Sequence, residues 1–163
     1  MGEATHFDDQ GRARMVDVGA KSVSARRAVA TGEVHVSAET LRRIRTGDIP
    51  KGDCFAVARL AGIMAAKKTS ELVPLCHPIH LTDVEVEIEA DEAAGVLRLR
   101  AETRALDRTG VEMEAMTAAA VAGLTLYDML KGVERGIEIG PIRLALKEGG
   151  KSGTWTREGE GGA

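Results

Sequence analysis

The stretches VEVEIE at residues 84–89 and LRLRA at residues 97–101 determine the fold of this chain, because apolar and charged residues alternate along both. Alternation with a period of two is typical of strands that bury one face and expose the other. The Asp91-to-Gly95 turn joins the two stretches, so we predict an antiparallel hairpin that sets a glutamate face beside an arginine face. Opposite charges at such cross-strand positions contribute roughly a few tenths of a kcal/mol each. The apolar face of the hairpin needs helices to cover it.

Two helices are predicted before the hairpin. Ser37 is placed to cap a short helix that Gly47 closes. Asp53 is placed to cap a second helix over residues 54–66, in which Arg59 is the only charged residue.

A longer helix is predicted after the hairpin. Thr109 and Glu112 have the spacing of a capping box, in which the Glu112 side chain closes the start of a helix that runs to about Val133. Residues 115–127 of this helix carry no charge.

The order of these elements indicates an α+β fold. If the region Glu33–Val36 supplies the first strand and residues 137–146 supply the last, the order is strand, helix, strand, strand, helix, strand. This is the ferredoxin-like split βαβ pattern, an antiparallel sheet with helices packed on one face. The apolar phase of the last strand flips at Gly140-Pro141, which predicts a bulge or an edge position there.

Length and charge limit the classes of protein that this chain can belong to. Its 163 residues suit one domain, which we place at residues 21–152, between a flexible N-terminal arm (1–20) and a flexible C-terminal tail (153–163). A net charge of −3 argues against a nucleic-acid partner. The uncharged stretches are shorter than the ~20 residues of a membrane span, and no basic and apolar leader begins the chain. We therefore expect a cytoplasmic protein, with its two cysteines reduced.

The apolar helices predict that the chain is oligomeric. A helix packed on one sheet normally shows one apolar stripe and one polar face. Neither residues 54–66 nor residues 115–127 contain a polar face, and a two-layer domain of this size cannot cover such helices on every side. We expect another copy of the chain to cover them.

Ionisable residues at the end of the long helix are candidates for catalysis. Asp128 interrupts an apolar run, and Lys131 lies three residues later on the same helical face. A buried carboxylate is costly unless it is paired, so the two form either a structural ion pair or a tuned acid/base couple. Lys51, in the turn before the second helix, is either a solvated lysine or part of the same chemistry.

A second set of candidates lies elsewhere in the sequence. His77 is either a catalytic imidazole or, with Cys76 and His80, a metal ligand, but the spacing completes no known metal motif and we expect no metal. Glu112 either closes the capping box or takes part in the chemistry, whereas Glu114 has no structural explanation of this kind.

The spacing of these charges favours a site shared between subunits. Glu114 and Asp128 lie about 21 Å apart along one helix, which is too far for one small substrate to contact both. If the same helix of a second copy runs antiparallel across a twofold axis, Glu112 and Glu114 of one chain meet Asp128 and Lys131 of the other. We therefore expect the site at the subunit interface.

Seven motifs, in order and over roughly residues 5 to 155, resemble the cyclic pyranopterin monophosphate synthase family of molybdenum cofactor biosynthesis. The motifs are Met15-Val16-Asp17-Val18 with Lys21, Lys51-Gly52-Asp53, Ala61-Gly62-Ile63 with Ala65-Ala66-Lys67, Pro74-Leu75-Cys76-His77-Pro78, Thr109-Gly110-Val111-Glu112-Met113-Glu114-Ala115, Tyr127-Asp128-Met129 and Gly149-Gly150-Lys151-Ser152-Gly153.

The resemblance implies a ferredoxin-like subunit in a homohexamer, a trimer of dimers with active sites at the subunit interfaces. It implies a lyase whose small-molecule nucleotide substrate, a cyclised dihydroguanosine triphosphate, is converted to cyclic pyranopterin monophosphate with release of pyrophosphate. No redox cofactor is implied, and the need for Mg²⁺ with the substrate phosphates stays open.

The resemblance also assigns roles to residues. Asp128 matches the active-site acid, and Lys51 and Lys131 match essential lysines. The substrate-binding segments correspond to Leu75, Cys76, His77, Met113 and Glu114, and further site positions to Glu112 and Lys147. A lysine beside a carboxylate in an apolar wall is expected to titrate closer to neutrality, which suits general acid/base catalysis. The alternative is a non-catalytic, ferredoxin-like oligomer that binds a nucleotide without consuming it.

Overall fold

The predicted hairpin is present and forms one edge of the sheet. In the computed structural model, which describes residues 10–159, β2 (Leu81–Asp91) pairs antiparallel with β3 (Val96–Asp107). Glu87 lies opposite Arg100, and their side chains are 3.3 Å apart, so the opposed glutamate and arginine faces are confirmed. The predicted arm and tail extend into residues 1–9 and 160–163, which lie outside the described residues.

The first strand begins earlier than predicted. β1 (Ser24–His35) contains the Glu33 end of the predicted region, but most of it precedes that region. Its centre, residues 28–30, is buried on both faces: Ala28 and Ala30 belong to the main core, and Val29 packs with Ala145 and Leu146 of β5 (Arg143–Glu148). A strand buried on both faces is a continuous apolar run in the sequence. The centre of β1 therefore lacks the alternation of apolar and polar residues from which a strand is predicted.

The strands form one antiparallel sheet in the order β2-β3-β1-β5-β6, where β6 spans Trp155–Thr156. The predicted last strand is divided in two: β4 (Glu138–Ile139) pairs with β1 separately from β5. Gly140-Pro141, a cis peptide bond with a Gly140 φ of +137°, separates them. The predicted irregularity is thereby confirmed, and the β1–β5 register also shifts, between Val29 and Ala30.

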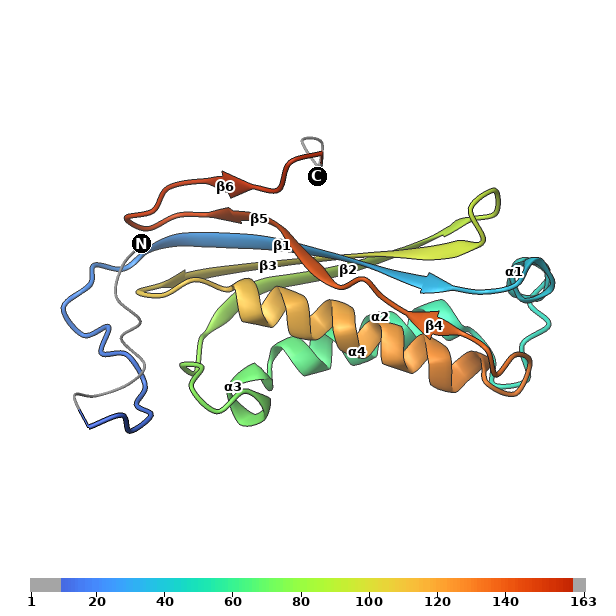
Figure 1. Cartoon of the computed structure of the whole chain (residues 1–163), viewed down its shortest axis with the longest axis horizontal. Coiled ribbons are helices and arrows are strands. Elements are labelled where there is room, and N and C mark those ends of the chain that lie inside the picture. Colours follow the sequence, from blue (N-terminus) through green and yellow to red (C-terminus); the bar gives the residue numbers. More distant parts are fainter. Residues whose placement is uncertain (1–9, 160–163) are drawn as a thin grey trace.

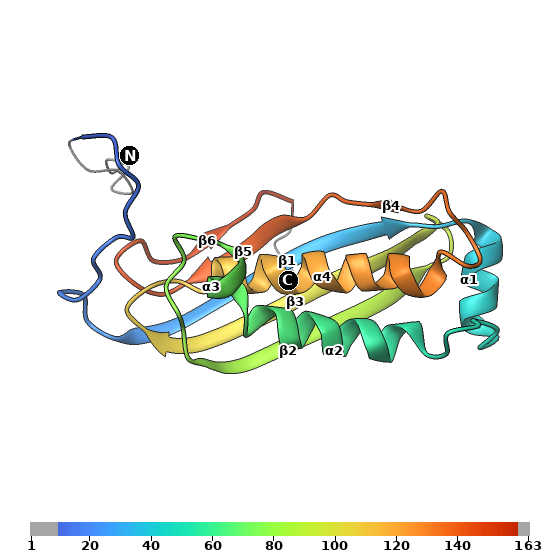
Figure 2. The same cartoon turned by 90° about the horizontal axis from the view of Figure 1, so that it is seen from below.

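Helices cover one face of the sheet. α2 (Cys54–Ala66) and α4 (Glu112–Leu130) lie side by side below it, and α1 (Ala38–Arg45) lies at one end of the molecule (Figure 1). The single turn of α3 (Thr69–Leu72) lies at the opposite end of the helix layer (Figure 2). α2 approaches α4 closely, because a Cβ on Gly62 would lie 3.0 Å from the Ala118 carbonyl oxygen. The fold is therefore an α+β arrangement with the apolar core between the two layers.

Two of the three predicted helix caps are confirmed. The Ser37 side chain accepts a hydrogen bond from the Thr40 amide, and Asp53 caps α2. The capping box is wrong: α4 begins after Val111, and no described side chain caps it. Glu112 instead forms an ion pair with Lys147, with a 2.6 Å separation, and its carboxylate lies over Gly110, where a Cβ would collide with it.

The outer face of the helix layer is apolar, as predicted. Leu60 and Met64 of α2 are 59 % and 53 % exposed, and Leu124 of α4 is 60 % exposed. In a single chain these apolar side chains are exposed to water. A contiguous exposed apolar surface is energetically costly and is typical of a protein–protein interface. No helix in the described part of the chain is long and apolar enough to cross a membrane.

Candidate active site

The predicted site residues form two groups at opposite ends of α4. Lys51, Asp128 and Lys131 meet at its C-terminal end and form what we call the lysine–aspartate cluster. The Lys51 ammonium donates to the Asp128 Oδ2 and to the Asp128 carbonyl oxygen, both at 2.7 Å. The Lys131 ammonium lies 2.7 Å from the other carboxylate oxygen, Oδ1. Local structure produces this arrangement, because Lys51 lies in the turn before α2 and Lys131 follows the last residue of α4.

The two lysines set the charge state of the lysine–aspartate cluster. Hydrogen bonds from Lys131 and then Lys51 lower the pKa of Asp128 to about 2, and Asp128 in turn raises the pKa of Lys131. The expected pKa closer to neutrality is therefore wrong for Lys131 in a single chain. The hydrogen bond with Asp128 and then the charge of that carboxylate raise the Lys131 pKa, and burial opposes them only weakly because Asp128 is 53 % and Lys131 52 % exposed.

The second group surrounds a cavity of about 670 Å³ at the N-terminal end of α4, which we call the histidine–glutamate pocket. The loop after α3, the start of α4 and the segment 16–21 form its walls. All six predicted positions in this region line it: Leu75, Cys76, His77, Glu112, Met113 and Glu114. The remaining predicted residue, Lys147, reaches the pocket through its ion pair with Glu112.

Glu114 is the most perturbed acid of the pocket. Its residue is 3 % exposed, and its Oε2 atom has no hydrogen-bond partner among the described residues. Burial raises the pKa of Glu114 to about 7, with further contributions from the charges of Glu112 and Asp107. A carboxyl of this kind can hold or release a proton near neutral pH, which is the property required of a general acid or base.

His77 is held in one orientation by the segment that precedes β1. Its Nε2 atom lies 2.7 Å from the Val16 carbonyl oxygen, which can only accept, so Nε2 carries the hydrogen. A neutral His77 then presents the lone pair of Nδ1. Val16 and Val18 line the pocket although they belong to the predicted arm, and the alternation of apolar residues around Asp17 was the available sequence signal.

The thiols are free and mainly protonated. Burial raises the pKa of Cys76 in the pocket and that of Cys54 at the start of α2. Among residues 10–159, no group of three His, Cys, Asp or Glu side chains is placed to hold a metal ion.

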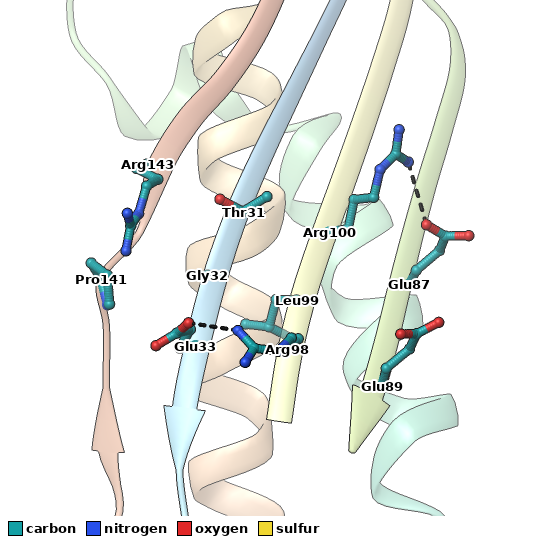
Figure 3. A pocket seen from close by; sticks show the side chains of 10 residues that line it. All are labelled: Thr31, Gly32, Glu33, Glu87, Glu89, Arg98, Leu99, Arg100, Pro141 and Arg143. Atoms are coloured by element: carbon teal, nitrogen blue, oxygen red, sulfur yellow. Dashed lines mark hydrogen bonds and ion pairs between the residues drawn. The ribbon is translucent and has the colours of Figure 1, made fainter. Parts of the chain in front are cut away.

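A further hollow, of about 390 Å³, lies on the opposite face of the sheet and contains none of the predicted site residues (Figure 3). Its charges are paired within the chain: Arg98 lies 2.9 Å from Glu33 and Arg100 lies 3.3 Å from Glu87. Such pairing leaves little unbalanced charge to attract an ionic substrate. The candidate site is therefore on the helical side of the sheet.

Each chain thus contains two separate groups of candidate residues, which we call half-sites. Glu114 and Asp128 lie about 21 Å apart along α4. The exposed face of α4 between them is apolar and includes Leu124.

Comparison with known proteins identifies the family of this chain. A model described as the MoaC family matches residues 15–150, a range that includes every residue of both half-sites. Relatives from Roseiflexus castenholzii, Geobacter sulfurreducens and Brucella ovis, each named cyclic pyranopterin monophosphate synthase, are 54 %, 56 % and 58 % identical to this chain. The matches cover 94 % of this chain and 97 %, 96 % and 93 % of the respective relatives. The chain belongs to the MoaC family.

Proposed function

We propose that this chain is an enzyme of molybdenum cofactor biosynthesis with the activity for which its relatives are named. It converts a cyclised dihydroguanosine triphosphate to cyclic pyranopterin monophosphate and pyrophosphate. The observation that carries this proposal is the clustering of all ten site residues implied by the resemblance into two half-sites, in a chain matched over 94 % of its length by relatives of that name. The reaction rearranges the substrate without a net change of oxidation level, so we expect it to need no redox cofactor.

The complete site is proposed to form between two copies of the chain. If α4 of a second copy runs antiparallel across a twofold axis, the lysine–aspartate cluster of one copy meets the histidine–glutamate pocket of the other. The exposed Leu60, Met64 and Leu124 supply the apolar surface that such a contact buries. A ferredoxin-like subunit is supported by the strand order β2-β3-β1-β5, with helices after β1 and β3. We further propose that three such dimers form a homohexamer.

The residues of the shared site fit the proposed chemistry. To close the cyclic phosphate, a substrate hydroxyl oxygen bonds to the α-phosphorus while the bond to the departing pyrophosphate breaks, and a base accepts the hydroxyl proton. Lysine ammonium groups stabilise the charge that develops on the leaving group. Burial of the lysine–aspartate cluster by a second copy lowers the pKa of Lys131 from its raised value in a single chain, which suits proton transfer.

The test of the activity is incubation of the purified protein with the cyclised nucleotide, followed by assay of pyrophosphate and of a pterin product. Wild-type protein is expected to form both, and Lys51→Ala or Asp128→Asn to form neither while the oligomer persists. Near-normal release of pyrophosphate by either variant would refute the assignment. A non-catalytic binding module would bind the nucleotide and release no pyrophosphate.

Mixed oligomers test whether the site is shared. Lys51→Ala and Glu114→Ala are each expected to be inactive because each removes one half-site. Random mixing by co-expression makes about half of the dimers mixed, and one of the two sites in each mixed dimer is then entirely wild type. About a quarter of the wild-type activity should return. If oligomers shown to be mixed recover no activity, the two half-sites of different copies do not form one shared site.

A further inference from the structure

Lys21 is positioned at the histidine–glutamate pocket by a short, well-connected segment. The Asp17 carboxylate accepts a hydrogen bond from the Gly19 amide at 2.8 Å, and the Lys21 amide donates to the Val18 carbonyl oxygen at 3.0 Å. The bond from His77 to the Val16 carbonyl oxygen ties this turn to the opposite wall. The backbone of Lys21 is therefore fixed beside the pocket, and its residue is among those that line it.

Among the described residues, no opposite charge matches that of Lys21. Within residues 10–159, no carboxylate lies within ion-pair distance of its ammonium, whereas Lys51 and Lys131 share Asp128 and Lys147 is paired with Glu112. Of the described residues that line the pocket, Lys21 alone carries a fixed positive charge. The complement of such a group is an anion.

The start of α4 adds hydrogen-bond donors on the same side. The first amides of a helix have no partners within the helix, and no described side chain caps those of α4. Thr109 and Gly110, together with residues 112–114, line the pocket, so this helix start faces the same cavity as Lys21. Helix starts of this kind attract negative charge. The buried Glu114 oxygen that lacks a partner is a separate sign that the cavity receives a polar ligand.

The pocket has an apolar interior and a charged opening. Val73 and Ile79 contribute to its walls together with the buried carboxyl of Glu114, which suits a flat heterocycle with polar edges. Lys21 is exposed to water. Burying a multiply charged phosphate chain is costly, so the chain of a bound nucleotide lies toward water and the base lies deeper.

We infer that Lys21 binds the phosphate chain of the nucleotide substrate, with the base placed toward Glu114. The inference rests on the proposed function for the identity of the substrate, and it assigns Lys21 a part of that substrate. Lys21 neutralises phosphate charge as a point cation, in addition to the lysines of the lysine–aspartate cluster.

The test measures how affinity depends on the number of phosphates. Guanosine, GMP, GDP and GTP serve as probes in calorimetric titrations of the full-length oligomer. For wild type, affinity is expected to increase along this series. Lys21→Met keeps the aliphatic stem and removes the charge, so it should weaken GTP binding roughly tenfold or more and leave guanosine binding unchanged. Lys21→Arg should retain most of the dependence on phosphate number.

Lys68→Met is the matched control, because Lys68 is exposed and does not line the pocket. If Lys21→Met fails to fold, Lys21→Gln replaces it in the same series. Equal GTP affinity in wild type and Lys21→Met would overturn the inference, as would an equal loss for guanosine and GTP. Failure of the proposed function is separate: wild type would show the phosphate dependence and release no pyrophosphate from the cyclised nucleotide.

Discussion

The buried carboxyl of Glu114 predicts an unusual dependence of stability on pH. Burial raises the pKa of Glu114 from an ordinary 4.5 to about 7. An acid with a raised pKa in the folded state binds its proton more tightly there than in the unfolded chain, so stability falls as pH rises from the unfolded value through the folded one. Since each factor of ten corresponds to about 1.4 kcal/mol, the wild type is expected to lose about 3 kcal/mol of stability between pH 4.5 and pH 7 through this group.

Glu114→Gln removes this loss because glutamine stays neutral at every pH. The variant is expected to match the wild type near pH 4.5 and to exceed its free energy of unfolding by about 3 kcal/mol at pH 8. Urea unfolding at both pH values, with the protomer concentration held constant, measures the difference. Glu85→Gln is the control, since Glu85 is exposed on β2.

The predicted difference is specific to Glu114 in its apolar surroundings. If the stabilities of wild type and Glu114→Gln change in parallel between the two pH values, the carboxyl does not hold its proton in the folded state and the reasoning is refuted. The same substitution should lower turnover, because glutamine cannot exchange the proton. A gain in stability with a loss of activity is the expected signature of a group kept for catalysis.

Two further perturbations test the interface and the sheet. Leu124→Asp should leave the subunit folded, since Leu124 is 60 % exposed, but should dissociate the oligomer and abolish turnover; sedimentation at the wild-type mass would contradict this. Glu102→Gln should lower the free energy of unfolding by about 3 kcal/mol at pH 7, because hydrogen bonds from Arg27 first, and then from Arg100 and Arg104, lower the pKa of Glu102 from 4.5 to about 2. Since that stabilisation is present above pH 4.5 and is lost as pH falls through 2, the deficit should shrink at pH 3, and a deficit independent of pH would contradict the assignment.

The sequence predicted those parts of the fold that depend on local patterns. The hairpin was predictable because β2 and β3 each expose one face, and the caps at Ser37 and Asp53 because their partners lie within three residues. The extent of β1 was not predictable from period, since both faces of its centre are buried. Burial on the second face comes from Ala145 and Leu146, far along the chain.

For the candidate site, the sequence predicted some of the contacts between its residues and less of its electrostatics. The Asp128–Lys131 contact follows from helical spacing, whereas the contact of Lys51 with the same carboxylate requires the turn before α2 to fold against the end of α4. The role of Glu112 was misread, because its partner, Lys147, is distant in sequence and the local capping box was the simpler explanation. Spacing in the sequence predicts which residues are neighbours along one helix or strand. The charge state of a side chain depends also on residues from every other element that packs against it.

The position of the two half-sites explains why apolar helices and isolated charges occur together in this chain. A substrate that needs both the lysine–aspartate cluster and the histidine–glutamate pocket cannot bridge about 21 Å of α4 within one subunit. An antiparallel contact between two copies of α4 would bring the opposite ends of the helix together. It requires that the helix surface between the two ends be apolar enough to associate.

Leu124 and its neighbours on α2 supply that apolar surface. In the proposed dimer the same contact would remove Asp128 and Lys131 from water and so change their pKa values from those of the single chain. If the proposed dimer is correct, assembly and catalysis depend on one surface, and a substitution that weakens association is expected to lower the rate even when it touches no site residue.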